Sequence, residues 1–281
     1  MNIRDIVARA LAEDLGAGDV TTQALFPEAA PAVGTIVAEE RDGLVVAGLA
    51  VAVEVFTQVD SSLTCSANVK DGDRVPNGTT VLTVTGDGRS ILKGERAALN
   101  FLQRLSGIAT LTAKFCEAVN GTRARILDTR KTTPGLRALE KWAVTLGGGY
   151  NHRHSLGDGV LIKDNHLSLA GGDVARACRL VIERAKRAPH GLKIEVEART
   201  LEDVRAALEG GADIILLDNM DVPLIRKSVA LIKGRALIEV SGGVSLATVR
   251  KIATAGPDYI SVGALTHSAP AANFSMDIVP R

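Results

Sequence analysis

The sequence has few aromatic residues and few cysteines, and each shortage excludes a class of protein. Aromatic residues make up only 3% of the 281 residues, too few for a nucleic-acid surface that works by base stacking. Cys65, Cys116 and Cys178 are odd in number and widely separated, so neither a disulfide framework nor a zinc site is indicated. We therefore expect no nucleic-acid partner and a location in the reducing cytoplasm.

Long hydrophobic runs and an excess of charge of one sign are also missing. The longest apolar run, 43–53, is far too short to span a bilayer. The N-terminal segment 1–15 is charged and amphipathic, without the apolar core of a signal peptide. The formal net charge is only +1, which argues against a broad surface for nucleic acids or anionic lipids. We therefore expect no membrane partner.

The sequence is instead rich in small and aliphatic residues, with a hydrophobic content of 46%, a composition typical of α/β proteins. Apolar residues at helical spacing predict a helix over 3–15, which ends at Gly16. Turn-separated segments between 33 and 84 follow a β pattern and predict an α+β domain. Within it, 69–86 resembles the hairpins of lipoyl or biotinyl carrier modules, but no lysine lies at an exposed turn, which disfavours a carrier function.

A long helix is predicted over 94–120, and we place the boundary between two domains in it. An apolar stripe marks the buried face of this helix. The other face carries a polar stripe that ends in a very small residue, and that stripe faces solvent, a charged site or another backbone. The stripe consists of Arg96, Asn100, Gln103 and Gly107. The predicted domains are residues 1–106 and 107–267.

After residue 121, short apolar strands alternate with helical segments. This alternation predicts parallel strands that are joined by crossover helices. Each strand ends in polar or glycine residues, so an α/β barrel with its site at the C-terminal strand ends is favoured over an open sheet. The roughly 145 residues leave room for about six or seven strands, fewer than in a complete eight-stranded barrel. The fold class is therefore α/β, with an incomplete barrel of six or seven strands.

A dense group of cationic side chains lies within residues 126–166. In a chain of net charge +1, this local excess indicates a pocket for a compact, multiply charged anion. Such cations hold carboxylates by charge-assisted and often bidentate hydrogen bonds. The members of this group are Arg130, Lys131, His152, Arg153 and Lys163.

Carboxylates follow at the ends of the later strands. Because strand side chains alternate, Glu195 and Glu197 point to the same side, and we expect Glu197 to reach the ligand while Glu195 lies deeper and paired. Glu197 and Asp218 are hard oxygen ligands suited to Mg²⁺. Carboxylates that face cations in one barrel mouth suit a substrate with a metal-bound pyrophosphate.

Two glycine segments at the last two predicted strands indicate phosphate binding. Each follows a strand, so each can present backbone N–H groups to an anion. Paired phosphate loops after the last two strands recur in barrels. The first segment is Ser241, Gly242 and Gly243, and the second is Gly263, Ala264 and Leu265.

Several of these segments closely resemble signature segments of the quinolinate phosphoribosyltransferase family. They include DTRKTTPGLRALEKWAV, GGGYNHRHSLGDGVLIKDNH, IEVEARTLEDV and EVSGG, and the resemblance covers almost the whole chain. It implies an N-terminal α/β sandwich domain, an incomplete barrel, and a C-terminal tail, 268–281, that returns to the first domain. It also implies a homodimer with shared active sites, and leaves higher assembly open.

The resemblance also implies roles for individual residues. The dicarboxylate quinolinate would be bound by Arg130, His152, Arg153, Lys131 and Thr129, and by Arg96 of the other subunit. Lys163 would lie near the reacting ring and phosphoribosyl diphosphate. Glu197 and Asp218 would hold ribose hydroxyls, and they would hold Mg²⁺ through water. The two glycine segments would hold phosphate. The residues expected to act in catalysis are Lys131, Lys163, Glu197 and Asp218.

The implied reaction forms nicotinate mononucleotide, pyrophosphate and CO₂ in de novo NAD biosynthesis. Two residues depart from the family pattern: His154 stands where an apolar residue is more frequent, and Asp164 replaces a frequent glutamate. A phosphoribosyltransferase with another acceptor, such as nicotinate, is disfavoured by the intact cationic pairs that suit two carboxylates. A non-catalytic protein that binds a phosphosugar or a dicarboxylate is the alternative from a different class.

Overall fold

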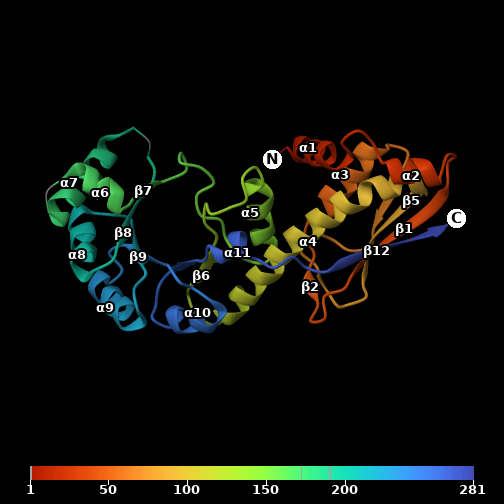
Figure 1. Cartoon of the computed structure of the whole chain (residues 1–281). Helices are drawn as coiled ribbons and strands as arrows, with labels where there is room; N and C mark the ends of the chain where they lie inside the picture. The colour runs from red at the N-terminus through yellow and green to blue at the C-terminus, as the bar shows by residue number, and fades with distance from the viewer. Residues whose placement is uncertain (1, 172, 190) are drawn as a thin grey trace. The chain divides into compact units, whose positions relative to one another are not determined.

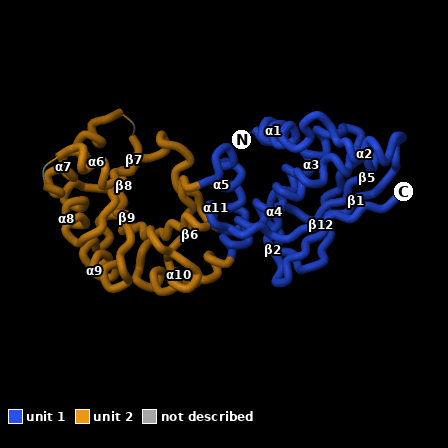
Figure 2. Tube along the Cα trace, viewed as in Figure 1, with its two compact units in different colours: residues 1–113, 132–148, 265–281 blue, residues 114–131, 149–264 orange. Residues whose placement is uncertain are grey.

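The computed structural model describes residues 2–171, 173–189 and 191–281, and they pack as two compact units (Figure 2). Unit 1 contains Met1–Ala113, Thr132–Gly148 and Leu265–Arg281, and unit 2 contains Lys114–Lys131 and Gly149–Ala264. The domain limits 1–106 and 107–267 stay a prediction, because compact packing and independent folding are different properties.

Unit 1 is built on a four-stranded sheet with the order β12-β1-β5-β3. Neighbouring strands are antiparallel, and β12 at the C-terminus pairs with β1 from Ala38↔Phe274 to Ala32↔Pro280 (Figure 1). The C-terminal tail therefore lies in the sheet of the N-terminal part of the chain. The strands are β1 (Pro31–Ala38), β3 (Thr64–Ala67), β5 (Thr80–Asp87) and β12 (Phe274–Pro280), and a small sheet pairs β2 (Leu44–Val45) with β4 (Arg74–Val75).

The first two helices of unit 1 follow from local sequence. The predicted N-terminal helix is confirmed as α1 (Ile3–Leu15), which ends at Gly16. The glycine-rich segment after it provides a helix cap, because the Asp19 carboxylate accepts the Thr22 N–H at 2.9 Å and begins α2 (Val20–Leu25). Such capping satisfies an N–H group that has no partner within the helix.

Of the β segments expected between 33 and 84, the one over 44–50 is wrong at its end, because Leu49 begins the helix α3 (Leu49–Val59). Carboxylate oxygens of Asp71 accept the N–H groups of Gly48 at 2.7 Å and Leu49 at 3.0 Å. The helix therefore begins on a cap that comes from a distant residue. Its valines favour a strand locally, but burial of one helical face overrides that preference.

The long predicted helix is confirmed as α4 (Gly88–Ala118), which begins six residues before the expected start at residue 94. The lower half of its polar stripe faces another backbone. A side chain at Gly107 would lie 2.0 Å from the Pro270 carbonyl oxygen, and the Gln103 carbonyl accepts the Ala272 N–H at 2.9 Å. Arg96 and Asn100, in the upper half, are exposed. Unit 1 also contains α5 (Arg137–Leu146).

Unit 2 is a parallel sheet of six strands with the order β6-β11-β10-β9-β8-β7, so β6 and β7 form its two edges. This confirms the incomplete α/β barrel. Figure 1 shows α7 to α10 on the outer side of the strands. The strands are β6 (Arg125–Leu127), β7 (Val160–Ile162), β8 (Ile194–Ala198), β9 (Ile214–Asp218), β10 (Leu237–Ser241) and β11 (Tyr259–Ser261). The helices are α6 (Asp164–Ala170), α7 (Val174–Arg187), α8 (Leu201–Gly210), α9 (Val222–Ile232), α10 (Leu246–Ala253) and the short α11 (Ala264–His267), which runs into unit 1.

The strands of unit 2 are aliphatic because helices cover them. Ile215, Leu217, Ile238 and Val240 are almost completely buried, as expected for parallel strands between other layers. In the part of the chain that the structure describes, no helix is long and apolar enough to cross a membrane.

Candidate active site

The predicted site residues of unit 2 gather at the C-terminal ends of its strands. Parallel strands place these ends at one edge of the sheet, where barrel enzymes carry their active sites. Thr129 follows β6, Lys163 follows β7, Glu197 lies on β8, Asp218 ends β9, Ser241 ends β10 and Gly263 follows β11. One edge thus combines carboxylates, cations and glycines.

His152 is fixed by carboxylates from three parts of the sheet: Asp128 directly after β6, Glu195 on β8 and Glu239 on β10. Its backbone N–H donates to Asp128 Oδ1 at 2.8 Å. Its ring Nε2 lies 3.1 Å from Glu195 Oε2 on β8 and 3.4 Å from Glu239 Oε2 on β10. Its Nδ1 accepts the N–H of Arg153 at 2.7 Å. The imidazole therefore has a fixed orientation, and the prediction that Glu195 lies deep and paired is confirmed.

The charge of His152 depends on the two glutamates. Burial lowers the pKa of His152, but hydrogen bonds to Glu195 and Glu239 outweigh this and raise it to about 10. The Arg153 N–H favours the neutral ring, yet the charges of two buried carboxylates are the stronger influence. Burial and the charge of Glu239 in turn raise the pKa of Glu195. Glu239 is held by the Ser261 hydroxyl, which donates to its Oε1 at 2.5 Å.

Arg153 extends this cluster toward Arg130. Burial lowers the pKa of Arg153, and the nearby charge of Arg130 lowers it further. Arg153 Nη1 donates to the Gly159 carbonyl oxygen at 2.9 Å, while its Nε is buried with no hydrogen-bond partner among the residues described. Two guanidinium groups and a histidine held by carboxylates thus share one small region, which suits a ligand with more than one negative charge.

The carboxylates predicted to hold a metal lie close to a cation that the sequence analysis did not select. Arg199 Nη2 lies 3.0 Å from Glu197 Oε1, and its Nε lies 3.4 Å from Asp218 Oδ2. Arg199 Nη1 lies 3.0 Å from Asp164 Oδ2. Strand alternation carries a usable signal, because residue 199 continues the side of the strand set by Glu195 and Glu197.

Electrostatics link the two predicted carboxylates to Lys163. Burial and the charge of Asp218 raise the pKa of Glu197, and the charges of Lys163 and Arg199 act in the opposite direction. Glu197, Asp218 and Lys163 therefore lie near enough to influence one another. Such mutual repulsion between carboxylates favours a bound cation.

The glycine segment after β10 has a conformation that other residues rarely adopt. Gly242 has φ +92°, and a side chain there would lie 2.3 Å from Asn219 Oδ1. The Asn219 N–H donates to the Ser241 carbonyl at 2.9 Å, so the ends of β9 and β10 approach closely. Gly243 has φ +61° and no neighbouring atom within 4 Å of an added side chain. This segment therefore combines an open face with a constrained backbone.

The remaining predicted site residues have different surroundings. The Lys131 N–H donates to Thr129 Oγ1 at 3.1 Å in the turn after β6. Leu265 is fully buried, so only its backbone could contact a ligand, and Ala264 begins α11. Arg96 is exposed on α4 of unit 1, and its role in a partner's site stays a prediction.

His154 lies in an exposed turn outside the His152 network. The N–H groups of His154 and Ser155 both donate to Asp158 Oδ2 at 2.8 Å. This arrangement closes the turn between Arg153 and Gly159, and it accounts for the backbone at His154.

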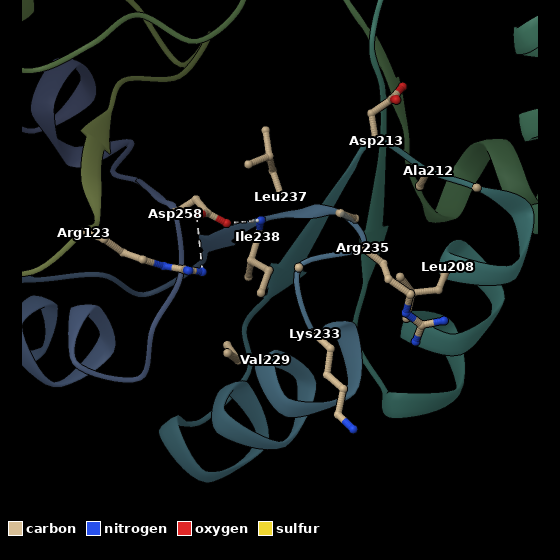
Figure 3. A pocket seen from close by; sticks show the side chains of 13 residues that line it. Arg123, Leu208, Ala212, Asp213, Val229, Lys233, Arg235, Leu237, Ile238 and Asp258 are labelled. Carbon is tan, nitrogen blue, oxygen red and sulfur yellow. Dashed lines mark hydrogen bonds and ion pairs between the residues drawn. The ribbon is translucent and has the colours of Figure 1, made fainter.

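A hollow of about 630 Å³ lies at the opposite end of the same sheet (Figure 3). Arg123 Nη2 pairs with Asp258 Oδ1 at 3.2 Å, and Asp258 Oδ2 accepts the Ile238 N–H at 2.9 Å. Figure 3 shows Lys233 and Arg235 extending away from this pair. The polar side chains of the hollow therefore do not converge on a common point, and none of the predicted site residues lines it.

Two family models match the chain. Residues 19–106 match the N-terminal domain of quinolinate phosphoribosyl transferase, and residues 108–277 match the C-terminal domain. Together they span both the sheet of unit 1 and the strand ends described above.

Known proteins are similar over the whole length. A mitochondrial quinolinate phosphoribosyltransferase (decarboxylating) of Nicotiana glauca is 44% identical, covering 99% of this chain and 82% of the relative. A probable nicotinate-nucleotide pyrophosphorylase (carboxylating) of Bacillus subtilis is 39% identical, with 99% and 94% covered. The crystal structure of nicotinate-nucleotide pyrophosphorylase from Ehrlichia chaffeensis has a TM-score of 0.93 at 38% identity, with 99% of both chains covered.

Proposed function

The chain belongs to the quinolinate phosphoribosyltransferase family, and from this premise we propose how its residues perform the family's reaction. The enzyme transfers the phosphoribosyl group of phosphoribosyl diphosphate to quinolinate with decarboxylation. The products are nicotinate mononucleotide, pyrophosphate and CO₂, for NAD biosynthesis. The observation that carries the assignment is that unit 2 brings together two charged groups: Arg153 lies near Arg130, and Glu197 lies near Asp218.

The cations bind the acceptor. Quinolinate has two adjacent carboxylates, and Arg130, His152 and Arg153 offer several donors in a fixed arrangement. Lys131 and Thr129, in the turn after β6, complete the set within one subunit. Fixed donors do not have to reorganise during the reaction, which makes their stabilisation of charge effective.

The carboxylates hold the phosphoribosyl donor. Glu197 and Asp218 bind ribose hydroxyls and Mg²⁺ through water, and Lys163 lies beside the reacting groups. The carboxylate oxygens suit the ion, because Mg²⁺ prefers hard oxygen ligands and a cationic group, Arg199, already pairs with both side chains. When bound there, Mg²⁺ would neutralise charge on the diphosphate. The phosphate is held by backbone N–H groups of Ser241, Gly242, Gly243, Gly263, Ala264 and Leu265.

The chemistry follows from this placement. The pyridine nitrogen attacks C1 of the ribose as pyrophosphate leaves, through a state with oxocarbenium character. The electron pair left on C2 when the 2-carboxylate departs as CO₂ is stabilised by the adjacent positively charged ring nitrogen, and C2 then takes up a proton from water to give nicotinate mononucleotide. Arg130 and Arg153 hold the dianion in line, so no covalent bond to the protein is required.

The assay that tests this function supplies quinolinate, phosphoribosyl diphosphate and Mg²⁺ to the purified protein. We expect CO₂ and nicotinate mononucleotide in equal amounts, measured by release of label from the 2-carboxylate and by chromatography. A parallel reaction with nicotinate should give far less product, because it lacks one of the two carboxylates. Absence of both products with quinolinate would contradict the function.

We further propose that the protein acts as a homodimer in which Arg96 enters the partner's site. Its exposed position on α4 supports this. Neither Arg96→Ala nor Arg130→Ala alone should be active, but a mixture should recover about a quarter of the wild-type turnover, because random pairing makes half of the dimers hybrids that each have one intact site. Sedimentation of the mixture checks the assembly. If the mixture stays inactive while dimers form, Arg96 does not act across the interface.

We keep the cytoplasm as the proposed location. The support is that Cys65, Cys116 and Cys178 are free thiols in the structure, as expected in a reducing compartment. The plant relative described above is named mitochondrial, so cell fractionation is the test. Recovery of the protein with an organelle would contradict the proposal.

A further inference from the structure

Arg199 lies among three carboxylates that come from successive strand ends. Asp164 follows β7, Glu197 lies on β8 and Asp218 ends β9. The guanidinium reaches them with a different nitrogen each, at 3.0, 3.0 and 3.4 Å respectively. A single positively charged side chain thus pairs with three carboxylates at the strand edge.

The carboxylates need such a partner when no other cation is bound. Glu197 and Asp218 are largely buried, with 9% and 16% of their side chains exposed. Repulsion between like charges is least screened in such surroundings. The Asn219 amide also donates to Asp218 Oδ2 at 3.1 Å, but it brings no positive charge. Arg199 therefore does electrostatically what a divalent cation would do in the same place.

The backbone of Arg199 is anchored while its side chain is not. The N–H groups of Arg199 and Thr200 both donate to Asp203 Oδ2 at 2.9 Å, which fixes the start of α8. The side chain is 54% exposed. Beside it lies a hollow of about 220 Å³, lined by Asp164, Glu197, Arg199, Asp203 and residues of α6 and α7. The guanidinium has room to leave the two metal carboxylates without any change in the backbone.

We propose that Arg199 is a built-in counter-ion that competes with the divalent cation for Glu197 and Asp218 and so sets the cation affinity of the free protein. The proposal rests on the Mg²⁺ site of the proposed function. In the free protein the guanidinium offsets part of the negative charge of Glu197 and Asp218, and when the cation arrives the side chain moves toward Asp164 and the neighbouring hollow. The chain thereby retains a low affinity for the cation alone.

The test measures Mn²⁺ binding to the full-length protein without any substrate. Mn²⁺ takes the same oxygen ligands as Mg²⁺, and the loss of its free-ion electron paramagnetic resonance signal reports binding directly. Arg199→Ala should bind Mn²⁺ about tenfold more tightly than the wild type, since the two modest ion pairs with Glu197 and Asp218 no longer compete. Arg199→Lys should fall between the two, because one ammonium group reaches fewer carboxylates than a guanidinium.

The matched control is Arg179→Ala, which removes the same charge from unit 2. Arg179 pairs with Glu209 at 3.6 Å and is similarly exposed, at 56%. Its loss should leave Mn²⁺ affinity unchanged, which excludes an effect of net charge. Thermal unfolding of each variant verifies that it is folded.

The inference would be overturned if Arg199→Ala bound Mn²⁺ no more tightly than the wild type. It would also be overturned if Arg179→Ala gained as much Mn²⁺ affinity as Arg199→Ala. The result is separable from the proposed function. Quinolinate turnover with no gain in affinity would overturn the counter-ion alone, and a gain in affinity without turnover would overturn the proposed reaction while supporting the counter-ion.

Discussion

The two ends of the parallel sheet in unit 2 use the same kind of side chain for different purposes. At the N-terminal end, Asp213 Oδ2 accepts the Ile194 N–H at 2.8 Å and Asp258 Oδ2 accepts the Ile238 N–H at 2.9 Å. At the C-terminal end, Glu197 and Asp218 face Arg199 and each other. The comparison teaches that a carboxylate is available to a ligand only where the backbone does not already use it.

The difference has a geometrical cause. Asp213 and Asp258 each directly precede a strand, and their carboxylates satisfy an N–H group at the beginning of the neighbouring strand. Residues at the C-terminal end meet side chains from adjacent strands instead. A buried donor without a partner destabilises a protein, whereas a group of unsatisfied charges favours a ligand. The first end should therefore control stability and the second activity.

The largest effect is expected at the C-terminal end. Asp218→Asn removes one charge from the cation site while keeping the shape of the side chain, so turnover with quinolinate should fall by about 100-fold or more. Stability should change little, since repulsion with Glu197 is relieved. Steady-state kinetics and thermal unfolding measure the two properties. Full activity in this variant would contradict the assignment of activity to the C-terminal end of the sheet.

A smaller effect is expected at the N-terminal end of the sheet, and it concerns stability rather than activity. Asp258→Ala removes the acceptor of the Ile238 N–H and the ion pair of Arg123 Nη2, so the free energy of unfolding should fall by about 1–3 kcal/mol. Turnover per folded molecule should stay within about twofold of the wild type, since such a stability change leaves most molecules folded. Urea denaturation and kinetics on the same samples provide the measurements. A large loss of turnover at unchanged stability would reverse the assignment of the two ends.

The smallest effect is expected from Glu195→Gln, because Glu239 remains beside His152. The folded-state pKa of His152 is raised to about 10, above its ordinary value of 6.5. Its charge therefore contributes stability that is fully present below pH 6.5 and is lost as the pH rises toward 10. Removing the Glu195 charge should lower the pKa of His152, so the stability that its charge contributes should be lost at a lower pH. Titration of the His152 ring by nuclear magnetic resonance, compared between the variant and the wild type, measures the change. An unaltered His152 titration would contradict the role of Glu195.

Local patterns predicted much of the fold and the members of the site. The helix Ile3–Leu15 has both of its ends encoded nearby. The strands of unit 2 were recognisable as apolar runs between helical segments. Alternation along β8 placed Glu195 and Glu197 on one side, and the order along the strand made Glu195 the deeper of the two. In each case the information lies within a few residues, where backbone geometry repeats at a fixed period.

Other features depend on residues far apart in sequence. The helix Leu49–Val59 begins on a cap from Asp71, and its own valines indicated a strand. Arg199 was overlooked because two of its partners are distant in the chain: Asp164 begins the helix after β7, and Asp218 ends β9. Periodicity gives the side of a strand on which a residue lies, but not the residue that it faces across the sheet.

The sequence by itself determined the alternation of strands and helices, the charges that end those strands, and the family. Only the tertiary structure decided which charges meet. His152 reaches Glu195 across 43 residues of chain, and the C-terminal strand Phe274–Pro280 completes the sheet begun by Pro31–Ala38. These pairings follow from the order of strands in the sheets, which is fixed by burial over the whole unit. Burial is a property of the packed chain, and no short segment of sequence contains it.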